Sequence, residues 1–230
     1  MNGLLLVDKP KGWTSFDVVA KVRGVLRAEA RVHGITSKIK VGHTGTLDPM
    51  ATGLLVLAIG SYTKKVPELT KQDKVYEATI TLGKTSNTDD AEGELTTISG
   101  AIPPESDVQQ ALQGFVGDIQ QVPPQFSAIK VAGVRSYNAA RSGKEVKLEP
   151  RSVTIYSISD IKYTYPKVTC VVSVGSGTYI RSLARDVGNV LAVGAYLSDL
   201  RRTSIADYTT ASAISPENIS SEIIAQKLLA

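Results

Sequence analysis

Hydrophobic residues recur along this chain with two spacings, which predict two kinds of element. Apolar runs and alternating apolar positions predict strands at residues 3–7, 54–59, 76–82, 153–161 and 168–174. Apolar positions three and four residues apart predict helices at 15–27, 106–115, 137–141 and 178–191, and one in the tail from 216 onward. Residues 196–205 are expected to form a strand or a loop. Because strands mostly follow one another, the order favours an α+β fold with a mixed, mostly antiparallel central sheet flanked by helices.

The boundaries of these elements carry cap and turn signals. Hydroxyl residues suited to cap helices precede the helical patterns, at Thr14 or Ser15, Ser106, Thr178 and Ser215. The polar residues 29–40 and the acidic residues 85–94 are predicted to be loops.

Composition narrows the class of protein. The chain has 230 residues, one Cys and two His, so an intrachain disulfide is impossible and a structural zinc site is not expected. No apolar run approaches the ~18 residues of a membrane span, and the N-terminus lacks a secretory pattern. We therefore expect a cytoplasmic protein with no membrane association. The net charge of +4 permits a polyanionic partner but does not establish one.

Residues 42–53 are the most unusual stretch, with several Gly and Thr residues around Asp48 and Pro49. Pro49 restricts the backbone of Asp48, and a carboxylate held on such a loop can serve as a nucleophile or base. The alternative is an ordinary Asp-Pro turn whose carboxylate accepts a local hydrogen bond.

Several long segments match the motifs of one enzyme family, in the family's order. They are GLLLVDKPKGWTS (3–15), KVGHTGTLDPMATGLL (40–55), TDDAEG (88–93), PPQFSAIK (123–130), GSGTYIRS (175–182), GAYL (194–197) and LRRT (200–203). With these segments the chain resembles the TruB family of RNA pseudouridine synthases. Residues 137–146 make it similar to the bacterial branch rather than to the branch that depends on guide RNA.

The resemblance implies a reaction and the residues that perform it. The reaction is isomerisation of uridine-55 in the T-loop of tRNA to pseudouridine, for which the family needs no cofactor and no metal. Asp48 corresponds to the family's nucleophile, and attack at C1′ of the sugar and at C6 of the base both stay open. Tyr76 corresponds to a tyrosine that lies against the target base, and Arg181 to an arginine that pairs with the nucleophile. A nearby cation favours an ionised carboxylate.

The resemblance also implies residues that bind the substrate. The target uridine must leave its stack to reach Asp48, and phosphate contacts offset the free energy of extrusion. Three residues are expected around the flipped-out nucleotide: His43, Tyr179 and Leu200. Three basic residues are expected to contact the RNA backbone: Lys130, Arg141 and Arg202.

The domain organisation follows from the same match. Residues 1–208 are expected to form the catalytic domain, with a basic RNA-clasping insert at about 123–151, and residues 209–230 a helical tail. Bacterial family members usually continue into an RNA-binding PUA domain, and we expect none here. The expected partner is the T-arm of tRNA, bound by a monomer with no obligate protein partner.

Two other functions stay open at this stage. One is an RNA-binding or tRNA-folding module in which catalysis is secondary. The other is the subunit of a guide-dependent pseudouridine synthase, which would be inactive without its partners.

Overall fold

The computed structural model describes residues 1–34, 39–127, 130–131, 134–135 and 147–229. Its backbone contacts divide the chain into two compact units. Unit 1 comprises Met1–Tyr76 and Arg201–Ala230, and unit 2 comprises Glu77–Leu200. Strands β4 (Lys74–Leu82) and β12 (Ala195–Ile205) contribute residues to both units. The sequence predicted a boundary at residue 209 between a catalytic domain and a tail. In the structure, residues 201–208 and the tail belong to the same unit, unit 1.

Unit 1 is built around the buried strand β3 (Thr52–Ile59). Strand β1 (Gly3–Lys9) pairs with it in antiparallel register along its length, from Gly3 opposite Ile59 to Lys9 opposite Gly53. The remaining elements of unit 1 are α1 (Ser15–Val32), β2 (Val41–His43), the 3-10 helix η1 (Gly60–Lys65), α2 (Val66–Leu69), β13 (Tyr208–Thr209), the 3-10 helices η2 (Thr210–Ser212) and η3 (Pro216–Asn218), and α6 (Ser221–Lys227).

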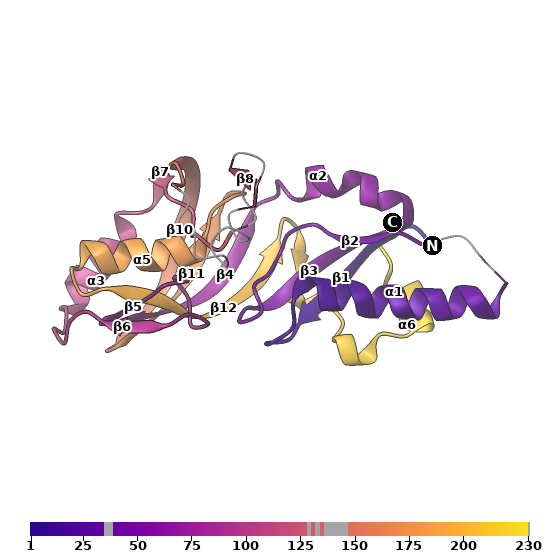
Figure 1. The fold of residues 1–230 in the computed structure, drawn as a ribbon, viewed down its shortest axis with the longest axis horizontal. Helices are drawn as coiled ribbons and strands as arrows, with labels where there is room; N and C mark the ends of the chain where they lie inside the picture. The colour runs from indigo at the N-terminus through magenta and orange to yellow at the C-terminus, as the bar shows by residue number, and fades with distance from the viewer. Residues whose placement is uncertain (35–38, 128–129, 132–133, 136–146, 230) are drawn as a thin grey trace. The chain divides into compact units, whose positions relative to one another are not determined.

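Alternation along β1 and β3 divides the unit 1 core into two layers. Leu5 and Val7 pack with one face of α1, which runs along that side of the strands (Figure 1), and with Ile224 of the tail. Leu4 and Leu6 point to the opposite layer, which η1, α2 and β13 cover. Successive strand residues face opposite sides of a sheet, so both faces of these strands are buried.

Helix α1 begins as the sequence predicted and ends later. Thr14 caps it through a capping box with Asp17, in which Thr14 Oγ1 accepts from the Asp17 amide at 3.1 Å. The predicted end near residue 27 is wrong, because buried Ala30 continues the apolar stripe for another turn. Phe16, whose spacing from Val19 would place it on the same stripe, is instead 67% exposed.

Unit 2 places two helices against antiparallel strands. Its main strands, in addition to its parts of β4 and β12, are β7 (Gly117–Gln121), β10 (Arg151–Thr164) and β11 (Lys167–Val174), and its helices are α3 (Glu105–Gln113) and α5 (Ile180–Val190). Two hairpins complete it, formed by β5 (Lys84–Ser86) with β6 (Leu95–Thr97) and by β8 (Lys130–Val131) with β9 (Val134–Arg135). Strand β10 lies between β7 and β11, antiparallel to both.

Helix α5 buries the face that its spacing predicted, through Ile180, Leu183, Ala184 and Val187. The predicted caps of α3 and α5 are wrong, because the cap positions are Pro104 and Tyr179. Thr178 instead donates its hydroxyl to the Gly175 carbonyl at 3.0 Å.

The α+β class with a mostly antiparallel sheet is confirmed. The pairing of β12 with β3 is parallel, whereas β3 pairs antiparallel with β1 and β2, β10 pairs antiparallel with β7 and β11, and β12 pairs antiparallel with β13. Among the described residues, every helix is too short or too polar to span a bilayer. The predicted short helix at 137–141 lies outside the described residues.

Candidate active site

Asp48 lies on an irregular loop between β2 and β3 that is held by side chains from other elements. Asp48 is half-buried, and its backbone carbonyl accepts a hydrogen bond from the Ala51 amide at 3.1 Å. Leu47 is buried, and Ser15 Oγ bonds both to its amide, at 2.8 Å, and to its carbonyl, at 3.0 Å. Buried backbone groups need partners, so this double contact fixes the residue before Asp48.

Lys9 holds the other side of the same loop. Its side chain is fully buried, and Nζ donates to the carbonyls of Trp13 at 2.6 Å, Pro10 at 3.0 Å and Pro49 at 3.4 Å. The Gly12 amide also donates to Pro49, at 2.8 Å. The turn after β1 and the Asp48–Pro49 step are therefore tied together by several bonds.

Arg202 does not lie where a phosphate could reach it. Its residue is 1% exposed, and its guanidinium donates to the carbonyls of Leu54, Gly45 and Thr46. The prediction of a phosphate contact is corrected on this ground. A sequence shows the charge of an arginine but not the side of the strand on which it lies.

His43 ends β2 and lies beside Phe16, with ring centroids 6.2 Å apart in an edge-on arrangement. Its Nδ1 is buried and has no hydrogen-bond partner among the described residues. Burial, and secondarily the Arg202 cation, lower the pKa of the imidazole. The ring is thus kept neutral at neutral pH, when it can either donate or accept a hydrogen bond.

Tyr76 lies at the end of unit 1, on β4, and is 7% exposed. Lys74 precedes it by two residues, so both lie on the same side of the strand. Lys74 is also buried, and Nζ donates to the carbonyls of Thr70, at 3.2 Å, and Gln72. Burial, followed by the Arg202 cation, lowers the pKa of Lys74 to about 8.

Arg181, in unit 2, is buried against Asp90. Its Nη1 lies 3.2 Å from Asp90 Oδ2, and their side chains are 7% and 3% exposed. The guanidinium also donates to the carbonyls of Thr88, at 3.2 Å, and Phe126, at 2.8 Å. Asp90 in turn accepts from Thr88 Oγ1 at 2.6 Å and from the Glu92 amide at 3.0 Å.

Asp90 is a functional candidate that the sequence did not single out. It was one of several acids in a predicted loop, and the family block containing it was the available signal. The neighbouring Asp89 pairs with Arg185 at 2.9 Å. Consecutive acids therefore bind two arginines one turn apart on α5.

The other predicted binding residues of unit 2 are distributed over several elements. Tyr179 is half-buried at the start of α5, where its backbone exchanges bonds of 2.9 and 3.1 Å with the Gln121 side chain. Leu200 is buried on β12. The backbone of Lys130 lies in β8, and Arg141 lies outside the described residues.

Asp48, His43 and Tyr76 belong to unit 1, and Arg181, Tyr179 and Leu200 belong to unit 2. The ion pair between Asp48 and Arg181 joins residues of different units and stays a prediction.

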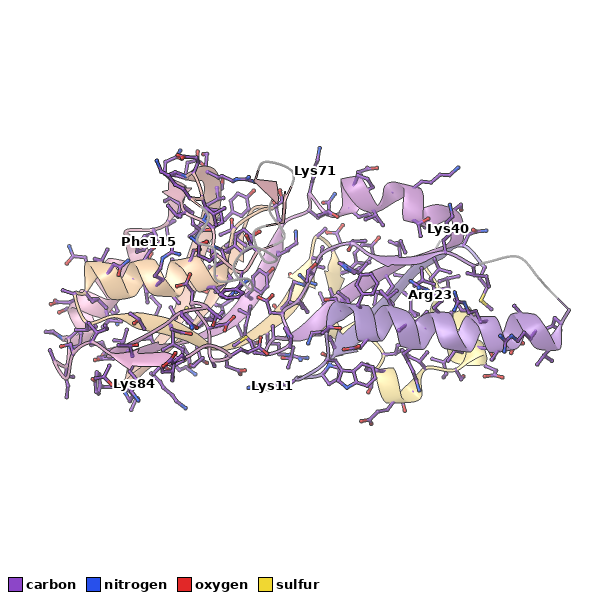
Figure 2. The ribbon with its side chains drawn as sticks, viewed as in Figure 1. Lys11, Arg23, Lys40, Lys71, Lys84 and Phe115 are labelled. Carbon is purple, nitrogen blue, oxygen red and sulfur yellow. The ribbon has the colours of Figure 1, made fainter. Side chains whose placement is uncertain are left out.

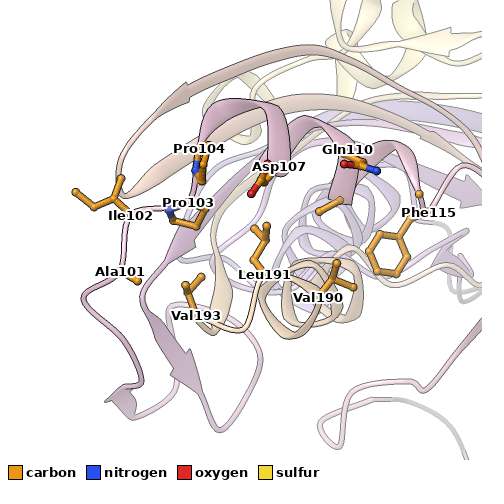
Figure 3. Close-up of a pocket in the computed structure, with 12 residues that line it drawn as sticks. Ala101, Ile102, Pro103, Pro104, Asp107, Gln110, Phe115, Val190, Leu191 and Val193 are labelled. Carbon is orange, nitrogen blue, oxygen red and sulfur yellow. The ribbon is translucent and has the colours of Figure 1, made fainter.

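Unit 2 also has an apolar pocket of about 790 Å³ between α3 and the end of α5. Phe115, Val190, Leu191 and Pro103 are among its lining residues (Figure 3). None of the predicted site residues lines this pocket, so its chemistry does not bear on the candidate active site.

Comparison with known proteins identifies the family. The profile described as "TruB family pseudouridylate synthase (N terminal domain)" matches residues 33–180, and that described as "tRNA pseudouridylate synthase B C-terminal domain" matches residues 181–229. The chain belongs to the TruB family of pseudouridylate synthases. It is therefore an enzyme of the isomerase class.

Several curated relatives are similar over nearly the whole chain. A tRNA pseudouridine synthase B of Thermobifida fusca is 44% identical over 236 residues, which cover 99% of this chain and 77% of the relative. The enzyme of the same name from Clostridium kluyveri is 41% identical over 229 residues, covering 100% of this chain and 76% of the relative.

Solved structures support the same fold. A Cbf5-Nop10-Gar1 complex contains a chain that is 29% identical with a TM-score of 0.72, and the match covers 98% of this chain and 55% of that one. An H/ACA RNP bound to a substrate RNA containing 2′-deoxyuridine contains a chain 27% identical with a TM-score of 0.69, matched over 98% of this chain and 54% of its own.

Proposed function

We propose that this chain converts uridine-55 in the T-loop of tRNA to pseudouridine, with Asp48 as the nucleophile. The observation that carries the proposal is the 41–44% identity, over almost the entire chain, to enzymes named tRNA pseudouridine synthase B. The held loop around Asp48 adds local support, because a nucleophile is most effective when its position is fixed before the substrate binds.

The reaction is an isomerisation in which atoms and electrons balance without a second reactant. Asp48 attacks C1′ or C6, the N1–C1′ bond breaks, and the uracil turns within the site. A C5–C1′ bond then forms, the bond between the Asp48 oxygen and C1′ or C6 breaks to restore the carboxylate, the proton on C5 leaves, and N1 ends with a proton. Tyr76 presents a ring against which the base stacks and a hydroxyl that accepts or relays the C5 proton. Arg181 balances the charge of the carboxylate.

The substrate is a folded RNA loop, so the target base must first be flipped out at a cost of a few kcal/mol. His43, Tyr179 and Leu200 are proposed to occupy the space around the extruded nucleotide. Lys130 and Arg141 are proposed to contact phosphates, which makes binding weaken as salt rises. The enzyme acts as a cytoplasmic monomer on the T-arm, with no obligate protein partner and no cofactor.

The test follows the proton that leaves C5. A T-arm RNA carrying tritium at C5 of its uridines is incubated with the purified chain, and release of tritium into water is measured. Asp48→Asn should abolish release while leaving RNA binding within about twofold of wild type, because an amide retains the size of the side chain but not its nucleophilicity. Asp207→Asn, the same exchange at an exposed turn of unit 1, is the matched control and should keep full activity. Full tritium release by Asp48→Asn would overturn the assignment of the nucleophile.

A second candidate is supported by the structural matches to chains in assemblies titled as Cbf5-Nop10-Gar1 and H/ACA RNP. It is the catalytic subunit of a guide-dependent enzyme. The same assay separates the two, because a stand-alone tRNA enzyme acts without added protein or guide RNA, whereas a subunit requires them.

A further inference from the structure

The loop that carries Asp48 spans a gap beside β3. One side of β3 is paired throughout with β1. On the other side, β2 pairs with the end of β3, with His43 opposite Leu57, and β12 pairs with its beginning, with Arg202 opposite Gly53. Between them the Val56 carbonyl accepts from the Thr44 amide at 3.0 Å. The Leu54 carbonyl lies in the remaining gap, where no strand of the described part of the chain is paired with β3 on this side.

The side chain of Arg202 fills this gap. Its Nε donates to the Leu54 carbonyl at 2.8 Å, and thus takes the place of a strand backbone amide. The two terminal nitrogens extend to the loop itself, where Nη2 donates to Gly45 at 3.0 Å and Nη1 to Thr46 at 3.3 Å. One buried group therefore bonds both to the central strand and to the loop, at positions two and three residues before Asp48.

Glycines permit this close packing. Gly53 has φ +101°, and a Cβ there would lie 2.2 Å from the Arg202 carbonyl oxygen, so β12 can approach β3 only at a glycine. A Cβ on Gly45 would lie 3.6 Å from Arg202 Nη1, which is ordinary contact. Gly53 is therefore the glycine that brings the backbone of Arg202 close enough for its side chain to reach under the loop.

We propose that Arg202 is a positioning residue, which sets the conformation of Gly45 and Thr46 and thereby the place of the Asp48 carboxylate. This inference rests on the proposed function, because it assumes that Asp48 is the nucleophile. The positioning role replaces the RNA contact that the sequence predicted for Arg202. The residue is 1% exposed, and its guanidinium donates to three backbone carbonyls within unit 1.

Arginine is required at this position for geometric reasons. Its planar guanidinium presents several N–H donors in fixed directions, whereas lysine presents one compact ammonium at the end of a flexible chain. Lysine keeps the positive charge and still binds phosphate as a point charge. The Arg202→Lys exchange therefore separates the two roles, because it removes the three-way contact and conserves charge.

The experiment compares wild type, Arg202→Lys and Arg23→Lys. Arg23 on α1 (Figure 2) is the matched control, since its Nη2 also donates to a backbone carbonyl of unit 1, that of Val41 at 3.5 Å, away from the Asp48 loop. Three quantities are measured for each protein: the single-turnover rate at saturating enzyme, the dissociation constant for T-arm RNA at two salt concentrations, and hydrogen exchange of the amides at 44–51.

For Arg202→Lys we expect the single-turnover rate to fall about 100-fold, the loss typical of a reacting group displaced by about 1 Å. The dissociation constant and its salt dependence should stay within twofold of wild type. Exchange at 44–51 should accelerate at a temperature well below unfolding, and Arg23→Lys should change none of these quantities. Where Arg202→Lys does not fold, Arg202→Gln is measured in its place, with the same expectations for rate and exchange.

Three results would overturn the inference. If Arg202→Lys binds RNA more weakly but keeps the single-turnover rate at saturating enzyme, Arg202 contacts phosphate instead of positioning the loop. A lower melting temperature with unchanged rate and unchanged exchange would leave it a merely structural residue. Unchanged exchange at 44–51 would by itself show that the guanidinium does not hold the loop. The exchange measurement needs no substrate, so it still reports on Arg202 if Asp48→Asn proves active and the proposed function fails.

Discussion

We predict that the buried ion pair of Asp90 and Arg181 contributes strongly to the free energy of unfolding. The two side chains are 3% and 7% exposed, and Nη1 lies 3.2 Å from Oδ2. Replacing Asp90 with Asn keeps the shape of the side chain and removes its charge. The Asn Oδ1 can still accept from Thr88 Oγ1 and the Glu92 amide, as Asp90 does at 2.6 and 3.0 Å. The main effect of Asp90→Asn is therefore the loss of the negative charge beside the Arg181 guanidinium.

The magnitude follows from the burial of the guanidinium that is left behind. Removing one partner of a buried ion pair costs about 3–5 kcal/mol, because the remaining buried charge loses that compensating partner. Arg181 retains the carbonyls of Thr88 and Phe126, and Asn retains two of the bonds of Asp90, so we expect the lower end, about 3 kcal/mol. For a chain of this length that corresponds to a fall in melting temperature of about 6–12 °C.

The assay is urea unfolding at pH 7.5, followed by circular dichroism. Glu149→Gln is the control, because it removes one charge of an exposed ion pair. The side chains of Glu149 and its partner Lys147 are 74% and 89% exposed, so this substitution should lower the free energy of unfolding by less than about 0.5 kcal/mol. The double variant Asp90→Leu with Arg181→Met should be less destabilised than the sum of its single changes, since it removes both charges of the pair. An Asp90→Asn protein within 1 kcal/mol of wild type would refute the reasoning.

Three further predictions follow from buried groups of unit 1. Because the pKa of Lys74 is lowered from its usual 10.5 to about 8, the unfolded chain binds more protons between these values, and stability should rise with pH there by up to about 3 kcal/mol relative to Lys74→Met. Ile224→Ala, in a fully buried tail position, should cost about 2–5 kcal/mol in urea unfolding, and a loss below 1 kcal/mol would show that the tail is not part of the core. Arg202→Gln should raise the pKa of His43 in an NMR titration, because a repelling cation is removed while burial remains, and His33 serves as the reference signal.

The strands and helices that the sequence predicted best are those with a strong apolar period. Helix α5 is amphipathic, and Ile180, Leu183, Ala184 and Val187 of its apolar face are all buried. Strand β3 is a continuous apolar run, typical of a strand covered on both faces, and both faces are covered. In these segments the local pattern and the tertiary packing require the same conformation.

Short polar strands were not predictable in this way. Strand β2 has only three residues, two of them Gly42 and His43, and forms because the edge of β3 is available to it. Strand β5 takes Thr85 and Ser86 from the predicted acidic loop, whose other residues connect β5 to β6 as a loop, and all of β6 is exposed. Such strands depend on partners distant in sequence rather than on their own hydrophobic pattern. The tail shows a related error, since Ser215 caps the short η3 turn and Ser220 caps α6.

The residues of the candidate site also differ in whether local sequence signals identify them. Asp48 could be assigned from its glycine-rich loop and the family resemblance, because those signals are local. The side chains that hold the loop could not, because Lys9, Ser15 and Arg202 act through carbonyls of residues that a sequence does not mark as acceptors. Asp90 was missed for the same reason, since its partner lies 91 positions away.

Buried cations also change how the charge of this enzyme should be interpreted. Lys9, Lys74 and Arg202 are each less than 10% exposed, and each directs its donors at backbone carbonyls. A desolvated cation is stable only when its hydrogen bonds are satisfied, so these groups are committed to the fold and are not available to phosphates. Attraction of RNA by unit 1 must therefore come from exposed cations such as Lys40 and Lys71 (Figure 2). The formal charge of +4 does not measure the binding surface, because it counts both kinds of cation alike.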